Sequence, residues 1–255
     1  EPSPFVEQVM ADAERLSAED EPYHREPITY EAPYLDNLPT APREKFAANI
    51  AAIQKLKEIE QRVANGGSPA FEDEQKILAQ YTGWGGLSDA FDPNKSAWSN
   101  EYSQLKAALS ESEYEAARSS TLTAFYTPAT VIHPIYRALE RFGVKGGKIL
   151  EPSMGTGAFL AHGHFGSSDA KFYGVELDSI TGRISKQLYQ KANIQVTGYE
   201  NALLPDNYFD CVIGNVPFGN FQVNDPQYNR LHFPIHDYFF AKSIDKLRTG
   251  GIMAI

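Results

Sequence analysis

The N-terminal half of the chain carries apolar residues at the spacing of amphipathic helices. Between residues 42 and 64 they recur every three or four positions, which predicts a helix over Pro42–Ala64 that ends at Asn65-Gly66-Gly67. Weaker patterns predict further helices at Phe71–Tyr81, Ser96–Leu109 and Glu113–Ser119, the last after a capping sequence at Ser110. Residues 1–41 hold six prolines and show little periodicity. We therefore expect an irregular N-terminal arm (1–41) followed by a helical region (42–120).

From residue 121 onward, short apolar runs alternate with helical patterns. The predicted strands are Lys148–Glu151, Lys171–Glu176, Ile194–Thr197, Phe209–Gly214 and Ile252–Ile255. The predicted helices are Thr130–Phe142, Ala158–His164, Ser179–Ala192 and Asp237–Leu247, the last with an apolar stripe of Tyr238, Phe239 and Phe240. Strands separated by helices predict the α/β class, with a Rossmann-like, doubly wound and mostly parallel sheet over residues 121–255. Because the last run reaches the end of the chain, we expect the sheet to be truncated and the sequence to be part of a longer protein.

A small-residue loop follows the first predicted strand. Gly155 and Gly157 open a tight turn after Glu151, and a helix begins behind them, as in nucleotide-binding strand–loop–helix units. Glu176 ends the next strand about twenty positions later, where a carboxylate can accept hydrogen bonds from both hydroxyls of a ribose. A plain glycine turn and a solvated strand-end carboxylate are the structural alternatives.

The fourth predicted strand ends in Gly214-Asn215-Val216-Pro217-Phe218-Gly219. An asparagine oxygen and a neighbouring main-chain carbonyl are two acceptors suited to an exocyclic amine, and an aromatic ring offers a stacking surface for a planar base. Since ligands of such sheets bind at the carboxyl ends of the strands, the glycine loop, Glu176 and Asn215 are expected to share one site.

Together these motifs resemble those of γ-type N6-adenine DNA methyltransferases, which carry an Asn-Pro-Pro-aromatic motif after a glycine loop and a Phe-x-Thr-Pro element before it. Here the upstream element is Phe125-Tyr126-Thr127-Pro128, and the resemblance covers about residues 121–255. It implies S-adenosylmethionine as cofactor, DNA as substrate and methyl transfer to adenine N6. Val216 departs from the family's first proline, although it keeps the carbonyl that the motif uses.

The resemblance also implies roles for individual residues. Those expected to bind the cofactor are Tyr126, Thr127, Pro128, Glu151, Pro152, Ser153, Gly155, Gly157, Glu176, Leu177, Glu200 and Asn201. Those expected to hold the target base are Asn215, Val216, Pro217 and Phe218. No metal ion is implied. Residues 81–93 look more loosely like the segment before the methylase in very large helicase–methyltransferase proteins of phages and conjugative elements, which implies downstream domains, including a helicase, as partners.

Charge and composition limit the possible binding partners and the cellular location of the protein. The chain carries a net charge of −10; residues 1–120 contribute −11 and residues 121–255 contribute +1. The acidity disfavours a freestanding nucleic-acid binder, because phosphate contacts rely on Lys and Arg. One cysteine and the lack of a long apolar run or signal peptide predict a cytoplasmic protein without a membrane segment. An uncovered sheet edge after Ile255 would permit self-association.

Several alternatives stay open at this point. The loop Tyr81–Pro93 is either a packed Ω-loop around Trp84 or a ligand or DNA contact. His162 and His164 form a weak metal pattern and are expected at a solvent-facing helix end. Arg230 and His232 belong either to a structural loop or to a DNA-phosphate contact. The substrate is alternatively RNA or a protein glutamine, and a non-catalytic nucleic-acid-binding or scaffold module would keep the same fold.

Overall fold

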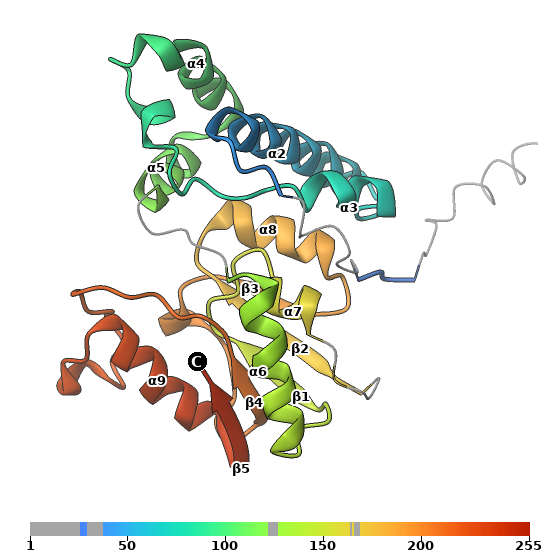
Figure 1. Cartoon of the computed structure of the whole chain (residues 1–255), viewed down its shortest axis with the longest axis vertical. Helices are drawn as coiled ribbons and strands as arrows, with labels where there is room; N and C mark the ends of the chain where they lie inside the picture. Colours follow the sequence, from blue (N-terminus) through green and yellow to red (C-terminus); the bar gives the residue numbers. More distant parts are fainter. Residues whose placement is uncertain (1–25, 30–37, 122–126, 164, 166–168) are drawn as a thin grey trace, which may run out of the picture.

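The computed structural model describes residues 26–29, 38–121, 127–163, 165 and 169–255. Within these ranges, five parallel strands form one sheet in the order β3-β2-β1-β4-β5 (Figure 1). The strands are β1 (Lys148–Glu151), β2 (Lys171–Glu176), β3 (Asn193–Val196), β4 (Phe209–Ile213) and β5 (Leu247–Ala254). Chain order reverses beside β1, so the carboxyl ends of β1 and β4 lie next to each other at the switch point where such sheets bind ligands. The predicted α/β, doubly wound parallel sheet is confirmed.

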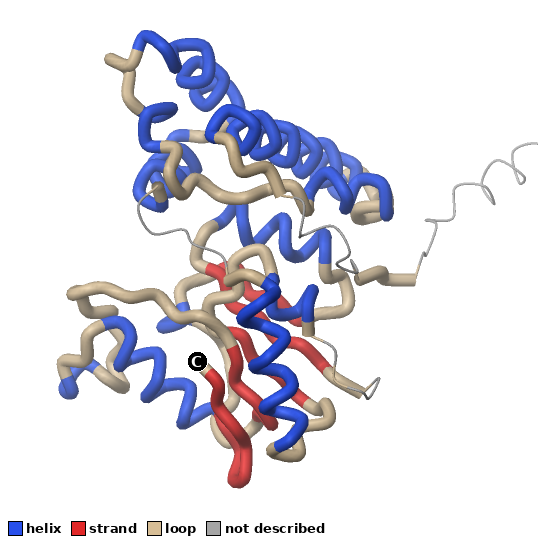
Figure 2. The backbone as a smooth tube through the Cα atoms, viewed as in Figure 1, coloured by secondary structure: helices blue, strands red, loops and turns tan. Residues whose placement is uncertain are grey.

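Helices cover both faces of the sheet. Helices α6 (Ala129–Arg141), α7 (Ala158–His162) and α8 (Ser179–Leu188) lie on one face, and α9 (Ile235–Lys246) lies on the other. Neighbouring residues of β1 show the alternation: Ile149 packs with α6 and α7, whereas Leu150 packs with α9. Figure 2 shows α6 running in front of the strands. No helix in the described ranges combines the length and apolarity needed to cross a membrane.

The helical region contains α2 (Pro42–Ala64), α3 (Glu72–Leu78), α4 (Ser99–Ala108) and α5 (Glu111–Ser120). The apolar residues that predict α2 form its buried face. Helix α5 begins with a capping box: the Ser110 hydroxyl accepts from the Glu113 N–H, and the Glu113 carboxylate accepts from the Ser110 N–H. Short 3₁₀ turns lie at Ser88–Phe91 (η2), Ser96–Trp98 (η3), Tyr199–Asn201 (η4) and Asn229–Leu231 (η5).

The loop at residues 81–93 is packed rather than open. Trp84 is only 1% exposed and contacts the rings of Phe46, Tyr81 and Phe91. The Asn49 amide of α2 donates to the Gly83 carbonyl at 2.6 Å and accepts from the Thr82 N–H at 2.8 Å. Of the two interpretations of this loop, the structural one is supported.

One hydrophobic cluster joins the helical region to α8. It contains Leu56 and Ile59 of α2 together with Ile180, Ile184 and Leu188 of α8. Figure 1 shows α2 and α3 lying against α8.

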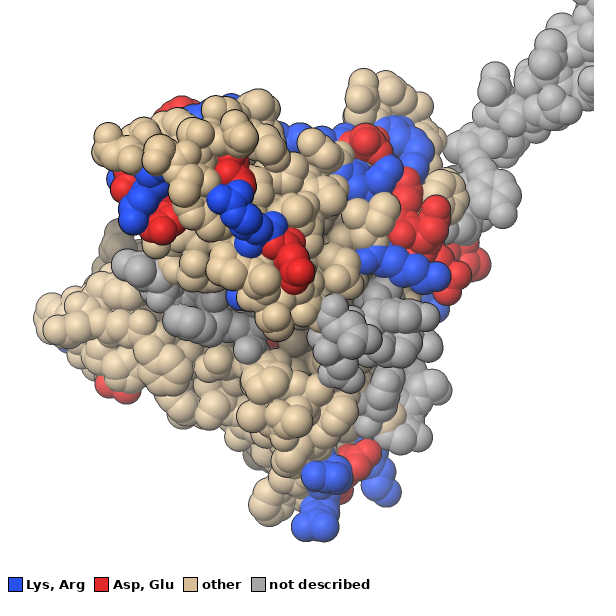
Figure 3. Space-filling view, turned by 45° about the horizontal axis from the view of Figure 1, so that its top comes forward, with Lys and Arg blue, Asp and Glu red and all other residues tan. Residues whose placement is uncertain are grey.

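Polar contacts border this cluster. The Arg183 guanidinium binds the carboxylates of Glu60 and Glu113, with nitrogen–oxygen distances of 2.5 to 2.7 Å. The Gln75 amide donates to the carbonyls of Gln187 and Leu188. Figure 3 shows that Lys and Arg on this part of the surface lie beside Asp and Glu.

Several predicted boundaries are wrong. Helix α8 ends at Leu188 rather than Ala192, because the chain from Tyr189 pairs with residues 28 and 29. Strand β5 begins at Leu247 rather than Ile252, and a bulge accommodates Gly250 at φ +79°. Helix α9 starts two residues early, at Ile235, and its Phe240 is 37% exposed rather than core.

Candidate functional site

The glycine loop after β1 combines positive backbone angles with tight packing. Gly155 and Gly157 have φ of +54° and +79°. Gly157 is also the N-cap residue of α7, and a Cβ atom there would lie 2.3 Å from the Tyr189 ring. Glycine at 157 is thus required by the fold itself, whereas the sequence suggests only close approach of a ligand.

Glu176 holds this loop from the end of β2. Its carboxylate accepts the Gly155 N–H at 2.8 Å and the Asp178 N–H at 2.7 Å. Burial raises the pKa of Glu176 to about 7, against the lowering effect of these N–H groups. A carboxylate has about four acceptor positions, so those that remain can accept hydroxyl groups of a ligand.

Glu151 lies beside the loop at the end of β1. It is 2% exposed, and burial, followed by the negative charge of Glu176, raises its pKa well above the usual range. Its Oε2 atom is buried without a hydrogen-bond partner among the described residues. A buried acceptor or hydroxyl without a partner is costly, and a polar ligand group at the switch point would satisfy it.

The loop after β4 presents its side chains in alternation. Asn215 is exposed, Val216 is 2% exposed within the apolar cluster under α9, and Phe218 is 71% exposed. The Val216 side chain therefore fills an apolar position under α9. The Phe218 ring stacks on His236 of α9, with ring centres 6.0 Å apart and planes 30° apart.

Ser153 connects the two loops. Its hydroxyl donates to the Asn215 carbonyl at 2.9 Å, so the glycine loop and the Asn215–Phe218 motif are in direct contact. Residue type alone does not reveal this bond, because it depends on both loop conformations.

The remaining predicted residues lie around this centre or outside the described ranges. Thr127 and Pro128 directly precede α6, and the Pro128 carbonyl accepts from the first turn of that helix. Tyr126 lies outside the described residues. Pro152 is buried, Pro217 is half-buried, and Leu177 is 75% exposed directly after Glu176.

Glu200 and Asn201 form η4 after β3. The Asn201 amide donates to the Glu200 carboxylate at 3.0 Å. Lys242 of α9 donates to the Glu200 carbonyl at 3.3 Å, a contact between α9 and η4 that residue type alone does not reveal.

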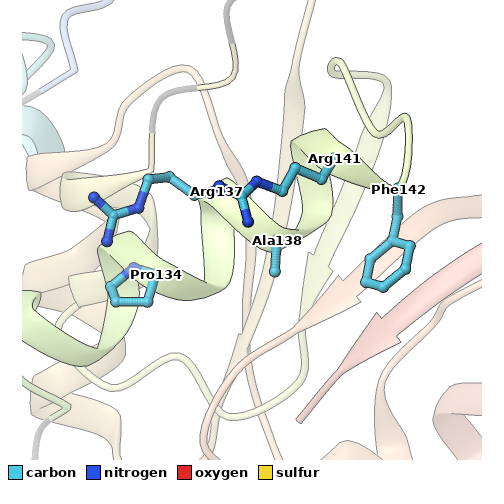
Figure 4. A pocket seen from close by; sticks show the side chains of 5 residues that line it. All are labelled: Pro134, Arg137, Ala138, Arg141 and Phe142. Atoms are coloured by element: carbon cyan, nitrogen blue, oxygen red, sulfur yellow. The ribbon is translucent and has the colours of Figure 1, made fainter.

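Two other features lie apart from this centre. His162 is buried and packs against His133, so its predicted solvent-facing position is wrong; His164 lies outside the described residues. No metal-binding group of three or more His, Cys, Asp or Glu occurs in the described ranges. An open groove of about 570 Å³ lies on α6 and is lined by none of the predicted site residues. Figure 4 shows its side chains, including Arg137 and Arg141, along that helix.

Comparisons with known proteins identify relatives of viral origin. "Defense against restriction protein B" of Escherichia phage P1 is 28% identical over 237 residues, which are 91% of this chain and 9% of that protein. "Modification methylase CviBIII" of Paramecium bursaria Chlorella virus NC1A is 30% identical over 135 residues, 51% of this chain and 36% of that protein. The chain therefore spans well under half the length of either relative.

A solved structure from Listeria monocytogenes, described as a class I S-adenosylmethionine-dependent methyltransferase, is 17% identical, with a TM-score of 0.45. It covers 81% of this chain and 72% of its own. The family model described as N-6 DNA Methylase matches residues 111–242. This segment is just over half of the chain and contains the motifs at Glu151–Gly157, Glu176 and Asn215–Phe218, and the chain therefore belongs to the N-6 DNA methylase family.

Proposed function

We propose that this protein transfers a methyl group from S-adenosylmethionine to the N6 amine of adenine in DNA. The observation that carries the proposal is the hydrogen bond from the Ser153 hydroxyl to the Asn215 carbonyl. It brings a loop suited to the cofactor against a loop suited to an amine-bearing base. Membership of the N-6 DNA methylase family supports the same reaction.

The residues around the glycine loop fit the cofactor. Glu176 retains acceptor positions for the two ribose hydroxyls, and exposed Leu177 offers an apolar surface beside them for the adenine ring. The partnerless Oε2 atom of Glu151 suits a polar group at the methionine end. Thr127 and Pro128 would border that end, and Glu200 or Asn201 would lie by the cofactor's adenine. When bound, S-adenosylmethionine supplies an electrophilic methyl group on a sulfonium.

The loop after β4 would hold the target base. Phe218, with most of its ring exposed, provides a face on which a flipped adenine can stack. The Asn215 side-chain oxygen and the Val216 carbonyl would accept the two N6 protons, which fixes the amine and increases the electron density on its nitrogen. The buried Val216 side chain would keep that carbonyl in place.

DNA is the favoured substrate among the alternatives. Loops with an asparagine and an aromatic residue also serve enzymes that modify RNA or protein glutamine. The family match and the viral modification methylase both concern DNA, whereas no feature of the described residues favours the other substrates. The protein would act on DNA in the cytoplasm. Other segments of a longer polypeptide would contribute to DNA recognition.

The proposal is tested by transfer of a tritium-labelled methyl group to unmethylated DNA, RNA and protein in parallel, using the full-length protein. Digestion of the DNA to nucleosides should yield labelled N6-methyladenine, and Asn215→Ala should abolish it. Label in RNA or protein alone, or label in DNA at cytosine, would contradict the proposal. Absence of label in all three, with intact cofactor binding by calorimetry, would favour the non-catalytic alternative.

A further inference from the structure

The loop between Phe218 and α9 presents an apolar and basic tip that the proposed function does not use. Leu231 and Phe221 are 56% and 55% exposed. Arg230 is exposed and forms no ion pair within the described part of the chain. Figure 1 shows this loop extending beside α9, at the left of the molecule.

A buried ion pair anchors the loop. Asp225 and Lys242 are each 5% exposed, and the Lys242 ammonium donates to the Asp225 carboxylate at 2.8 Å. The Tyr238 hydroxyl donates to the same oxygen at 2.8 Å. Burial tends to raise the pKa of Asp225, but Lys242 and Tyr238 lower it below its usual value. Buried ion pairs contribute little net stability compared with apolar packing, so this pair is better explained by the conformation it fixes.

Further hydrogen bonds fix the tip itself. The Asn229 side chain accepts from the Asp225 N–H and donates to Asn224, which closes the turn around η5. His232 ends that turn in the left-handed region, at φ +51°, and its carbonyl accepts from the Gln222 amide. A non-glycine residue in this region needs support from its surroundings. Arg230 and Leu231 are therefore presented on an ordered turn.

We propose that Leu231 is a wedge that enters the DNA stack beside the flipped adenine, and that Arg230 binds a phosphate of the same duplex. The inference rests on the proposed function, because a base held on Phe218 leaves a gap in the stack. Apolar side chains such as Leu fill gaps of this kind and reduce the cost of unstacking. The loop is continuous with the base-holding motif, and an unpaired cation beside the wedge matches the charge of DNA. Two exposed apolar side chains are too few for a stable interface with a second copy.

The wedge is tested in the full-length protein with Leu231→Asn. Ile244→Asn is the matched control, because Ile244 is equally exposed, at 56%, on α9. Sequencing of DNA methylated by the wild type gives the target adenine, which is then replaced by 2-aminopurine to report unstacking by fluorescence. We expect Leu231→Asn to reduce the fluorescence increase at least threefold and to raise KM for duplex DNA at least tenfold. Cofactor Kd should stay within twofold, as should every parameter of Ile244→Asn.

The phosphate contact is tested with Arg230→Gln against Arg137→Gln, an arginine on the α6 groove. Arg230→Gln should weaken duplex binding and reduce the slope of log affinity against log salt by about 1, and the control should change neither. Wild-type behaviour of Leu231→Asn and Arg230→Gln in a DNA-methylating protein would overturn this inference alone. Failure of the wild type to methylate DNA would overturn the proposed function and this inference together. Loss of dimer formation in Leu231→Asn, with unchanged DNA kinetics, would identify a protein contact and also overturn it.

Discussion

The carboxylate of Glu176 accepts a hydrogen bond from the main-chain N–H of Gly155 at 2.8 Å. The end of β2 thus fixes the loop that follows β1, although the two residues are 21 positions apart. A single acidic side chain supports the loop conformation and retains acceptor positions for a ligand.

Replacement of Glu176 by Ala should weaken S-adenosylmethionine binding at least tenfold. Hydrogen bonds to a charged group contribute about 1.5–3 kcal/mol, and about 1.4 kcal/mol corresponds to a factor of ten. Calorimetry on the folded variant measures the effect. Unchanged affinity would reject this residue as a ribose ligand.

The same residue should make stability and binding depend on pH in opposite directions. The Glu176 pKa rises from 4.5 to about 7 on folding, so its neutral form is favoured in the fold. The stability that the neutral Glu176 carboxyl group contributes to the fold is complete below pH 4.5 and is lost as pH rises to about 7. Cofactor affinity should increase through the same range, because the ionised carboxylate is the better acceptor. Glu176→Gln should flatten both profiles, measured by denaturant unfolding and calorimetry. Identical profiles in the wild type and the variant would contradict the assignment.

Asn215→Ala should separate cofactor binding from methyl transfer. Its side chain is exposed, and the proposed partner is the base rather than the cofactor. Cofactor Kd should therefore stay within twofold while transfer falls at least about 100-fold, the order seen when one positioned polar group is removed from an active site. Asn94→Ala, an exposed asparagine of the helical region, is the control. A variant that methylates at the wild-type rate would make Asn215 structural.

Ser153→Ala should lower transfer without unfolding the protein. The lost hydrogen bond to the Asn215 carbonyl contributes about 0.5–1.5 kcal/mol, or roughly 2- to 10-fold in rate if the base-holding loop loses its position. Ser153→Thr keeps the hydroxyl and should restore most of the activity. Equal rates for the Ala and Thr variants would exclude a positioning effect.

Gly157→Ala and Gly86→Ala separate backbone strain from steric overlap. Both glycines have similar φ, +79° and +77°, but a Cβ at 157 would overlap the Tyr189 ring, whereas a Cβ at 86 meets no atom within 4 Å. The shared strain should cost about 1–2 kcal/mol, and overlap should add about 1–3 kcal/mol for Gly157→Ala. Denaturant unfolding measures the difference. Equal losses would mean that Tyr189 moves aside freely.

Arg183→Met should destabilise the protein by about 1.5–3 kcal/mol, because two carboxylates lose a charged partner. Burial would raise the pKa of Glu113, but the Ser110 N–H and Arg183 lower it to about 2. The resulting stability is present above pH 4.5 and is lost as pH falls through about 2, so the variant should show a smaller acid-induced loss. Lys95→Met, which breaks an exposed pair with Asp89, should change stability by less than about 0.5 kcal/mol.

The sequence predicts the parallel strands well because they are short and apolar between polar or glycine-rich turns. Strands β1 and β2 match their predicted limits, which places Glu151 and Glu176 at strand ends. The limits of β5 and α8 are missed because remote partners decide them. Residues 28 and 29 pair with the chain after α8, and pairing with β4 extends β5 past two glycines.

The site is predicted as a set of residues but not as a set of contacts. Pattern and resemblance together select Glu176 and Asn215. They cannot show that main-chain N–H groups occupy part of the Glu176 carboxylate, or that Glu151 is buried with an unpaired oxygen. His162 illustrates the same limit, since its burial against His133 depends on the angle between α6 and α7.

The cluster shared by α2 and α8 determines how short a segment of this chain can be while its apolar surface stays covered. The family match begins at residue 111, yet Ile180, Ile184 and Leu188 are covered by side chains from residues 46–109. A polypeptide shortened to the matched segment would expose this apolar face of α8. We would expect it to aggregate on expression. Transfer of the matched segment to another protein therefore requires the preceding helices as well, because their side chains cover α8.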